Sequence, residues 1–363
     1  MAYTVKQIAE AVGAVAEGDL GVRVAGVAEP ASAKPDELAI AMDPKYASEL
    51  SQGGAQVAML WEGADWQALG LKAAILPPRP RYALSGVTKM LDKGQGFAPG
   101  IHPSAVIDPD AELGPDVSVG PLTVISAGAK IGAGSVIGPL CFIGVDAQIG
   151  PDAFLREHVS IGARVSIGAR FIAQSGVRLG GDGFSFVTAE LSTVEAARKT
   201  LGDRGDTQAQ PWTRIHSLGA VSIGDDVEMG MGSTIDNGTV RDTSVGSGTK
   251  IDNLVHIGHN ARVGRNCLLC GQCGVGGSSQ VGDNVVLGGQ VGVSDNIFIG
   301  DGVIAGGGTV ILSNVPAGRT MLGYPATQMD RQMDIYKALR RLPGLLRDVA
   351  KLKKAVSESD KGG

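Results

Sequence analysis

Two histidines lie three residues apart in the segment KIDNLVHIGHNARVG, which covers residues 250–264. The chain has only five histidines, so His256 and His259 are the first candidates for chemistry. A neutral imidazole near pH 7 can take a proton from an attacking amine or hydroxyl, and imidazole is also a common zinc ligand. Asp252 and Asn260 add polar groups beside the pair. The spacing alone allows a general base, a metal site or surface residues of a scaffold.

A six-residue period in the sequence predicts the structural elements that position these histidines. A large aliphatic residue stands at every sixth position through two long blocks of the chain. The first block contains Ile101, Ile107, Leu113, Val119, Ile125, Ile131, Ile137, Ile143, Ile149, Leu155, Ile161 and Ile167. The second contains Val245, Ile251, Ile257, Val263, Leu269, Val275, Val281, Leu287, Val293 and Ile299, and continues through Ala305 to Ile311.

This period predicts a parallel β-helix built from hexapeptides. Each unit supplies a short strand and a corner, and three units close one coil of about 18 residues. The aliphatic side chains should point inward and stack between coils. Glycine, which accounts for 55 of the 363 residues, should relieve the backbone at corners that need a positive φ. An amphipathic α-helix has a period of 3.6 residues and does not produce this spacing.

The coil period places Gly277 one coil above His259, since no residue is inserted between Val245 and Val293. A glycine stacked over a general base leaves room for a substrate, and its N–H can receive a developing oxyanion. An ordinary corner glycine remains the alternative. His256 and His259 lie on either side of the inward Ile257, so we expect them to diverge. No third histidine stands within two coils, which disfavours a metal site.

The four cysteines and the composition restrict the compartment and the partners. Cys267 and Cys273 occupy the small position of the hexapeptide and are expected in the core, so a cysteine ligand cluster is disfavoured. Clustered cysteines and an N-terminus without signal-peptide character favour reduced thiols in a cytosolic protein. A net charge of −5 argues against nucleic-acid binding. No apolar run reaches the roughly 20 residues of a membrane helix.

Two interruptions of the repeat precede the histidine pair. The first, residues 180–212, has an aromatic and glycine cluster followed by a charged segment, and it is expected to leave the coil as a loop. The second lies between Ile235 and Val245, where ten residues replace six. Departures from a rigid repeat are places where side chains can be directed at a ligand.

The period is absent from both ends of the chain. Residues 1–100 predict a small α/β domain, with a helix over Val5–Val15 and strands at VAML and AAIL. Residues 101–325 form the predicted β-helix domain. Residues 326–363 predict an amphipathic helical segment with nine basic and five acidic side chains from Gln328 onward, broken or kinked at Pro343. Such a segment is most often a solvated face, and it can also support a trimer or an acidic protein partner.

The motifs GGDGFSF, STIDNG and IDNLVHIGHN, together with AMDPKY near the N-terminus, resemble bacterial UDP-3-O-acylglucosamine N-acyltransferases of lipid A biosynthesis. The resemblance covers essentially the whole chain. It implies a mainly β fold, in which a left-handed β-helix of hexapeptide repeats follows a small uridine-binding α/β domain and precedes a C-terminal helical segment. The DN and IGHN elements in this register are fairly specific, whereas hexapeptides alone indicate only a broad superfamily.

The resemblance also implies roles for individual residues. His259 would deprotonate the glucosamine 2-amine as it attacks the thioester of a 3-hydroxyacyl group on acyl carrier protein, and Gly277 would supply the oxyanion N–H. The residues implied to bind or orient the substrate are Asp236, Asp252, Asn260, Phe184, Asp43, Lys45, Tyr46 and Asn296. The family works as a cytoplasmic homotrimer with active sites between subunits. No metal and no cofactor are implied beyond the acyl carrier protein co-substrate.

Some positions depart from the family pattern, and other activities stay open. Ile40 and Asp43 stand where the family has a uracil-stacking phenylalanine and an asparagine, and Asn296 stands where a second histidine is common. The sister UDP-N-acetylglucosamine O-acyltransferase is disfavoured because a separate domain precedes the repeat. A coenzyme A-dependent sugar-nucleotide N-acetyltransferase, a zinc enzyme and a non-catalytic trimeric scaffold are further alternatives. Residues 306–312 are candidates for the end of an acyl groove.

Overall fold

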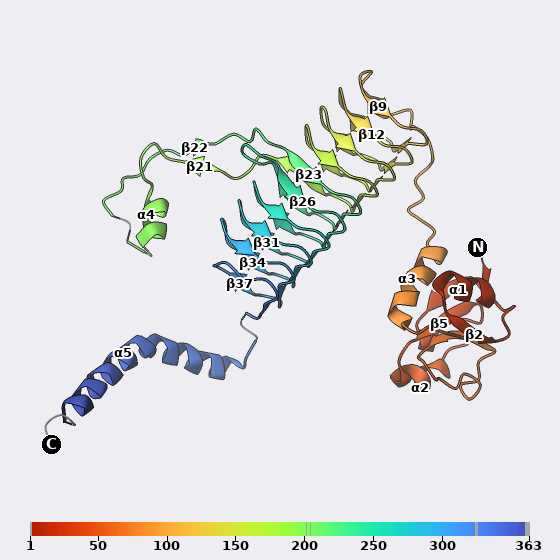
Figure 1. Ribbon diagram of the computed structural model, residues 1–363. Helices are drawn as coiled ribbons and strands as arrows, with labels where there is room; N and C mark the ends of the chain where they lie inside the picture. Colours follow the sequence, from red (N-terminus) through yellow and green to blue (C-terminus); the bar gives the residue numbers. More distant parts are fainter. Residues whose placement is uncertain (1, 201, 204, 324–325, 360–363) are drawn as a thin grey trace. The chain divides into compact units, whose positions relative to one another are not determined.

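The computed structural model describes residues 2–359 apart from 201, 204, 324 and 325. Its internal contacts divide the chain into two compact units, Met1–Phe97 and Ala98–Gly363, each of which is described by itself (Figure 1). The boundary expected at residue 325 and the last four residues lie outside the described part.

The first unit is a small α/β domain. Its five-stranded sheet has the order β2-β7-β6-β5-β4, in which only β2 and β7 are antiparallel neighbours. The strands of the unit are β1 (Tyr3–Thr4), β2 (Val15–Gly18), β3 (Arg23–Val24), β4 (Gly26–Ala28), β5 (Glu37–Ala41), β6 (Val57–Leu60) and β7 (Ala73–Leu76). The helices are α1 (Val5–Val12), α2 (Ala47–Leu50) and α3 (Pro80–Leu91), with short 3₁₀ turns η1 (Pro30–Ser32) and η2 (Pro44–Tyr46).

The burial pattern explains why these segments fold as they do. Strand β6 is buried along its whole length in the middle of the sheet, as the apolar run VAML predicts. Helices α1 and α3 pack against each other and share one apolar core with β5, β6 and β7. Helix α1 ends earlier than predicted, because Gly13 adopts a left-handed C-cap with a φ of 64° and Val15 begins β2.

The second unit is a parallel β-helix, as the six-residue period predicts. Its strands form three parallel sheets in which each strand pairs with strands of the coils above and below. Sheet C contains β10 (Ser118–Val119), β13 (Val136–Ile137), β16 (Phe154–Leu155), β19 (Ile172–Ala173), β24 (Glu228–Met229), β27 (Lys250–Ile251), β30 (Leu268–Leu269), β33 (Val286–Leu287), β36 (Ile304–Ala305) and β38 (Thr320–Met321).

Sheet D contains β8 (Val106–Ile107), β11 (Val124–Ile125), β14 (Phe142–Ile143), β17 (Ser160–Ile161), β20 (Arg178–Gly181), β25 (Thr234–Asp236), β28 (His256–Ile257), β31 (Gly274–Val275), β34 (Gly292–Val293) and β37 (Val310–Ile311). Sheet E contains β9 (Glu112–Leu113), β12 (Lys130–Ile131), β15 (Gln148–Ile149), β18 (Ser166–Ile167), β23 (Val221–Ile223), β26 (Thr243–Val245), β29 (Arg262–Val263), β32 (Gln280–Val281) and β35 (Phe298–Ile299).

The aliphatic residues of the repeat form one continuous core, which confirms the predicted fold class. From Val119 onward the predicted inward positions of both blocks are buried and stack in register, for example Ile257 on Val275. Ile101, the first of the series, is 54% exposed because it begins the helix and pairs only with Val119 above it.

The corners correct our expectation for glycine. The positive-φ position lies three residues after the aliphatic residue and is often not glycine, as at Leu254 and Asn260, both with a φ of 58°. The glycine that directly follows the aliphatic residue is required for a different reason. A Cβ on Gly264 would lie 2.4 Å from the carbonyl oxygen of Gly282 in the next coil. Glycine there permits close stacking of successive coils.

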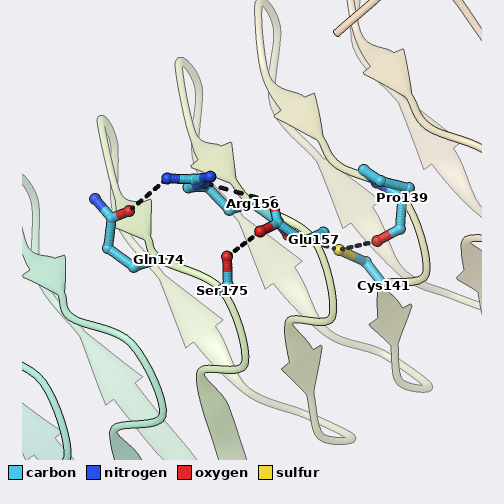
Figure 2. Close-up of polar contacts among 6 residues, drawn as sticks. All are labelled: Pro139, Cys141, Arg156, Glu157, Gln174 and Ser175. Carbon is cyan, nitrogen blue, oxygen red and sulfur yellow. Dashed lines mark hydrogen bonds and ion pairs between the residues drawn. The ribbon is translucent and has the colours of Figure 1, made fainter. Parts of the chain in front are cut away.

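Polar side chains also link successive coils at the corners. Figure 2 shows one such network, in which Glu157 accepts a hydrogen bond from Ser175 and pairs with Arg156 at 3.4 Å. The Ser175 hydroxyl lowers the pKa of Glu157 below its usual value. Beneath it, burial raises the pKa of the Cys141 thiol to about 11, and Sγ donates to the Arg156 carbonyl oxygen at 3.0 Å. A thiol held protonated in this way is unreactive.

The first interruption leaves the coil, as predicted, and the second also departs from it. The first forms an excursion with the antiparallel pair β21 (Phe186–Val187) and β22 (Thr213–Arg214) and the helix α4 (Thr193–Thr200) (Figure 1). The coil resumes at β23. The second interruption is a short loop between β25 and β26. Cys267 and Cys273 are buried in the core and unpaired, as expected.

Helix α5 (Met329–Ser359) follows the β-helix. Of the two outcomes expected at Pro343, a break does not occur, because the helix continues through this residue. Figure 1 shows the helix bending along its length, in agreement with the expected kink. Its apolar side chains form an exposed stripe that includes Met333, Leu339 and Leu346. Among the described helices, none combines the length and apolarity that a bilayer crossing requires.

Candidate active site

His259 lies at the corner that follows β28, between two glycines. A Cβ added to Gly277, one coil above, would lie 2.8 Å from His259 Nε2, and a Cβ added to Gly183 would lie 2.6 Å from its Cβ. The predicted stacking of Gly277 on His259 is therefore present in the structure. Gly183 lies where the excursion leaves the coil after β20, so the start of the first interruption packs against the His259 side chain.

The side chain of Asn260 holds the other edge of the imidazole. Its Nδ2 lies 3.0 Å from His259 Nδ1 and donates to Thr239 Oγ1 at 3.1 Å, while its Oδ1 accepts from the Thr239 N–H at 2.7 Å. The backbone N–H of Asn260 donates to Thr243 Oγ1 at 2.9 Å. Both threonines belong to the second interruption and the strand after it. The interruption therefore anchors the residue that orients His259.

Asp236 and His256 stand beside His259 in the same region. Asp236 Oδ2 lies 3.7 Å from His256 Nε2, and His256 Nδ1 lies 2.8 Å from Thr234 Oγ1. The Asp236 side chain is 17% exposed and that of His256 is 52% exposed. Burial raises the pKa of Asp236 above its ordinary value, while the two imidazoles and a hydrogen bond from the Phe184 N–H lower it in part.

An open cavity of about 630 Å³ joins these groups. Both histidines line it, together with Asp236, Gly277 and Asn296. Our expectation that the histidines diverge is wrong. His256 occupies the outward position of sheet D and His259 lies at the adjoining corner, so both border the same hollow.

One wall of the cavity is formed by outward positions that carry no side chain. Gly274 and Gly292 follow His256 in the outward column of sheet D, and nothing lies within 4 Å of a Cβ added to either. Val310 closes this row at the next coil and also lines the cavity. The backbone therefore forms the floor of a shallow groove that runs along the helix axis from the histidines.

The excursion supplies the aromatic wall. Phe184 and Phe186 line the cavity and meet edge to face, with ring centroids 5.1 Å apart. Arg214 from β22 lies over the Phe186 ring at 4.8 Å and pairs with Asp182 at 3.9 Å. Phe184 is 84% exposed, so its ring remains open to a ligand or to another chain.

Comparison with known proteins decides the family. No family model matches the chain. The chain is 70% identical to the UDP-3-O-acylglucosamine N-acyltransferase of Ruegeria pomeroyi over 358 residues, 99% of both chains. It is 62% identical to the protein of the same name from Paracoccus denitrificans over 363 residues, 100% of this chain and 99% of that one. The chain belongs to the UDP-3-O-acylglucosamine N-acyltransferase family. It is therefore an acyltransferase, and the family resemblance of its motifs is confirmed.

A solved structure supports the fold alone. The Arabidopsis UDP-N-acetylglucosamine acyltransferase shares 23% identity with the chain, with a TM-score of 0.50, over 62% of this chain and 71% of that one.

The structure brings together six of the residues that the family resemblance singles out. They are His259, Gly277, Asp236, Asn260, Phe184 and Asn296. Asp252, which the resemblance implies orients His259 or the sugar, does not line this cavity. It lies at the corner before β28, one strand away from the corner of His259, where its Oδ1 accepts from the Asn253 N–H at 2.7 Å. Two corners of one coil face different directions.

Asp43, Lys45 and Tyr46 form one turn of the first unit. The Asp43 carboxylate caps η2 by accepting from the Lys45 N–H at 3.0 Å, and the Lys45 ammonium lies 4.9 Å from the centroid of the Tyr46 ring. Ile40 packs into the core of this unit and is partly buried. It is not an exposed stacking surface.

Four residues of the site were missed or undervalued from the sequence. His256, Gly274 and Gly292 line the cavity, and Gly183 contacts His259. The six-residue period could have identified the two glycines of the groove, because it assigns them to the outward column of His256. Gly183 lies in the motif GGDGFSF, but no period describes the excursion, so the sequence did not place Gly183 against His259. The structure also shows no cluster of three or more potential metal-ligating side chains among the residues it describes.

Proposed function

We propose that the protein transfers a 3-hydroxyacyl chain from acyl carrier protein to the 2-amine of UDP-3-O-acylglucosamine. The observation that carries this proposal is the stacking of the His259 imidazole on Gly277 at the end of a groove, in a chain 70% identical to a protein named for that acceptor. Such acyl transfer places the step in lipid A biosynthesis.

The chemistry requires a base and an oxyanion site, and the cavity offers both. His259 Nε2 faces the hollow and takes a proton from the attacking amine, which forms the C–N bond as the thioester carbonyl becomes tetrahedral. The N–H groups of Gly276 and Ser278 are occupied by backbone carbonyls, whereas no partner is found for the Gly277 N–H among the described residues. That free donor is proposed to stabilise the oxyanion.

The groove fits an acyl chain. Gly274 and Gly292 leave a path of backbone that a methylene chain can follow, and Val310 stands across its far end. Val310 lies within residues 306–312, where the sequence suggests that an acyl groove ends. The groove therefore supports a donor that carries a long chain and disfavours acetyl transfer from coenzyme A.

We assign uridine binding to the turn with Asp43, Lys45 and Tyr46. A half-buried tyrosine ring and an adjacent ammonium suit a base and a phosphate respectively. With Ile40 in the core, Tyr46 is the aromatic ring of this turn that can contact uracil.

A homotrimer is supported by the difference between the three faces of the helix. The outward column of sheet E is polar over eight of its nine strands, beginning with the Glu112–Lys130 ion pair. In sheets C and D the outward columns carry apolar residues such as Val106, Phe142 and Leu268. Two faces that carry apolar residues and one largely polar face suit a closed ring in which each chain meets two others. Any contact of Asp252 with the acceptor would have to come from a neighbouring chain.

Helix α5 is the candidate docking element for the donor. Its exposed apolar stripe lies among basic side chains, including Arg340, Arg347 and Lys351, which suit an acidic protein. The reduced, unpaired cysteines and a carrier-protein donor are consistent with a cytoplasmic reaction.

The deciding experiment is an assay of the purified protein with 3-hydroxyacyl carrier proteins of graded chain length. We expect acylation of the UDP-3-O-acylglucosamine amine, with a sharp preference for one length. Preference for acetyl coenzyme A, or transfer to the hydroxyl of UDP-N-acetylglucosamine, would contradict the proposal. Stoichiometric zinc in the active protein would favour a metal enzyme instead.

A further inference from the structure

The proposed acyl transfer assigns no chemical step to Asp236 and His256, two polar residues of the cavity. Asp236 and His256 lie 3.7 Å apart beside His259, and His256 is fixed by its contact with Thr234 at 2.8 Å. A mostly buried carboxylate costs free energy unless something compensates it. Its position at the cavity wall suggests that part of the compensation comes from the substrate.

An amine acceptor presents a difficulty that a hydroxyl acceptor does not. An amino group with a pKa near 8 is largely an ammonium ion at neutral pH and has no lone pair for attack. It must lose one proton before it attacks and a second as the C–N bond forms. A single imidazole can hold only one of these protons.

We propose that Asp236 and His256 form the site that binds the acceptor's ammonium group and removes its first proton. This inference rests on the proposed function. The carboxylate is the anion that pairs with the ammonium. His256 is a positioning residue that holds Asp236 and passes the proton to water, since half of its side chain is exposed.

With this assignment, both protons that leave the acceptor's nitrogen are accounted for. The first proton leaves the ammonium through Asp236 and His256 to solvent. The free amine then attacks, His259 takes the second proton, and the C–S bond breaks. His259 returns that proton to the leaving thiolate. One proton is released to water, as the overall reaction of an ammonium with a thioester requires, and both imidazoles end as they began.

The charges around Asp236 favour a cation. On the side of the coil it faces His256 and His259, which lower its pKa when protonated, and on the side of the excursion it faces Asp182 and the Phe184 N–H. Asp182 adds negative charge, although Arg214 lies 3.9 Å from it. The cavity wall thus presents the Asp236 carboxylate where the acceptor's nitrogen would arrive, with the Asp182 carboxylate near it.

The first test compares Asp236→Asn with wild type across pH, using UDP-3-O-acylglucosamine as acceptor. Loss of the carboxylate should reduce kcat/KM at least about tenfold more at pH 6.5 than at pH 9.5, where the amine is already neutral. Asp108→Asn, a matched change at an exposed turn of the first coils, should leave the profile unchanged. A defect of Asp236→Asn that is equal at both pH values would overturn the inference.

The second test uses His256→Gln, which retains a hydrogen-bond donor but loses the titrating ring. Because an imidazolium lowers the pKa of Asp236, its removal should move the acidic limb of kcat/KM about one pH unit higher. His102→Gln, at the start of the helix, is the matched control. An unmoved acidic limb would contradict the role of His256. Wild-type protein that acylates no amine at any pH would instead overturn the proposed function itself.

Discussion

Two blocks of the same β-helix share one backbone pattern and differ in what they present to the outside. In the coils before the excursion, the outward column of sheet D carries Val106, Val124 and Phe142. In the coils after it, the same column carries His256, Gly274 and Gly292. The inward stack is continuous through both blocks. The comparison teaches that the candidate site is built on the outer surface of the repeat without altering its core.

The largest expected effect comes from removing the His259 imidazole of the second block. His259→Ala should lower the acyl transfer rate by about 10³-fold, because the base is lost while the core is untouched. Arg265→Ala, at the same repeat position six residues later, is the matched control and should stay within about twofold of wild type. Turnover assays and thermal melts of both variants measure this difference. Near wild-type turnover in His259→Ala would show that His259 is not the general base.

A smaller loss is expected when the ring remains but its support is removed. Asn260→Gly deletes the amide that contacts His259 Nδ1 and permits the positive φ of this corner. We expect a decrease in kcat of about 10- to 100-fold, since a displaced catalytic group loses much of its effect. Asn266→Gly changes the same repeat position, with a φ of 52°, away from the cavity. Equal activity of the two variants would show that Asn260 does not orient the ring.

The smallest expected effect comes from placing a large side chain in the glycine groove, as the first block has in the same outward column. Gly292→Met should lower the rate with the longest accepted acyl chain about tenfold and leave a shorter chain nearly unaffected, because the new side chain fills the open floor. Competition between carrier proteins with two chain lengths measures the shift, and the short donor serves as the internal control. An unchanged length preference would place the acyl chain elsewhere.

The same comparison shows what the sequence can predict. A strict six-residue period determines which residues point inward, so the fold and the stacking of Gly277 on His259 were predictable by counting. Counting also assigns His256 to the outer face of sheet D. We nevertheless expected it to point away from His259, because the repeat does not show how close an outward side chain lies to the next corner. The sequence also did not show that Asp252 lies at a different corner from His259, since closeness in the sequence does not say which corner a residue occupies.

The residues outside the repeat were the least predictable. Gly183 covers His259 from an excursion whose path depends on contacts such as its N–H to Ser217 Oγ at 3.0 Å. The end of α1 at Gly13 likewise depends on a left-handed C-cap that apolar spacing does not record. The structure offers no contact that explains why α5 continues through Pro343. The role of corner glycines became clear only from the distance between coils.

The proposed activity depends on the stacking of Gly277 on His259 in successive coils. One matched pair of variants tests this dependence most directly. Gly277→Ala places a Cβ 2.8 Å from His259 Nε2, whereas Gly289→Ala, two residues after an aliphatic as Gly277 is, meets its nearest atom at 3.5 Å. We predict that Gly277→Ala lowers amine acylation about 100-fold or more with an unchanged melting temperature, and that Gly289→Ala retains activity. Equal activity of the two variants would contradict the account.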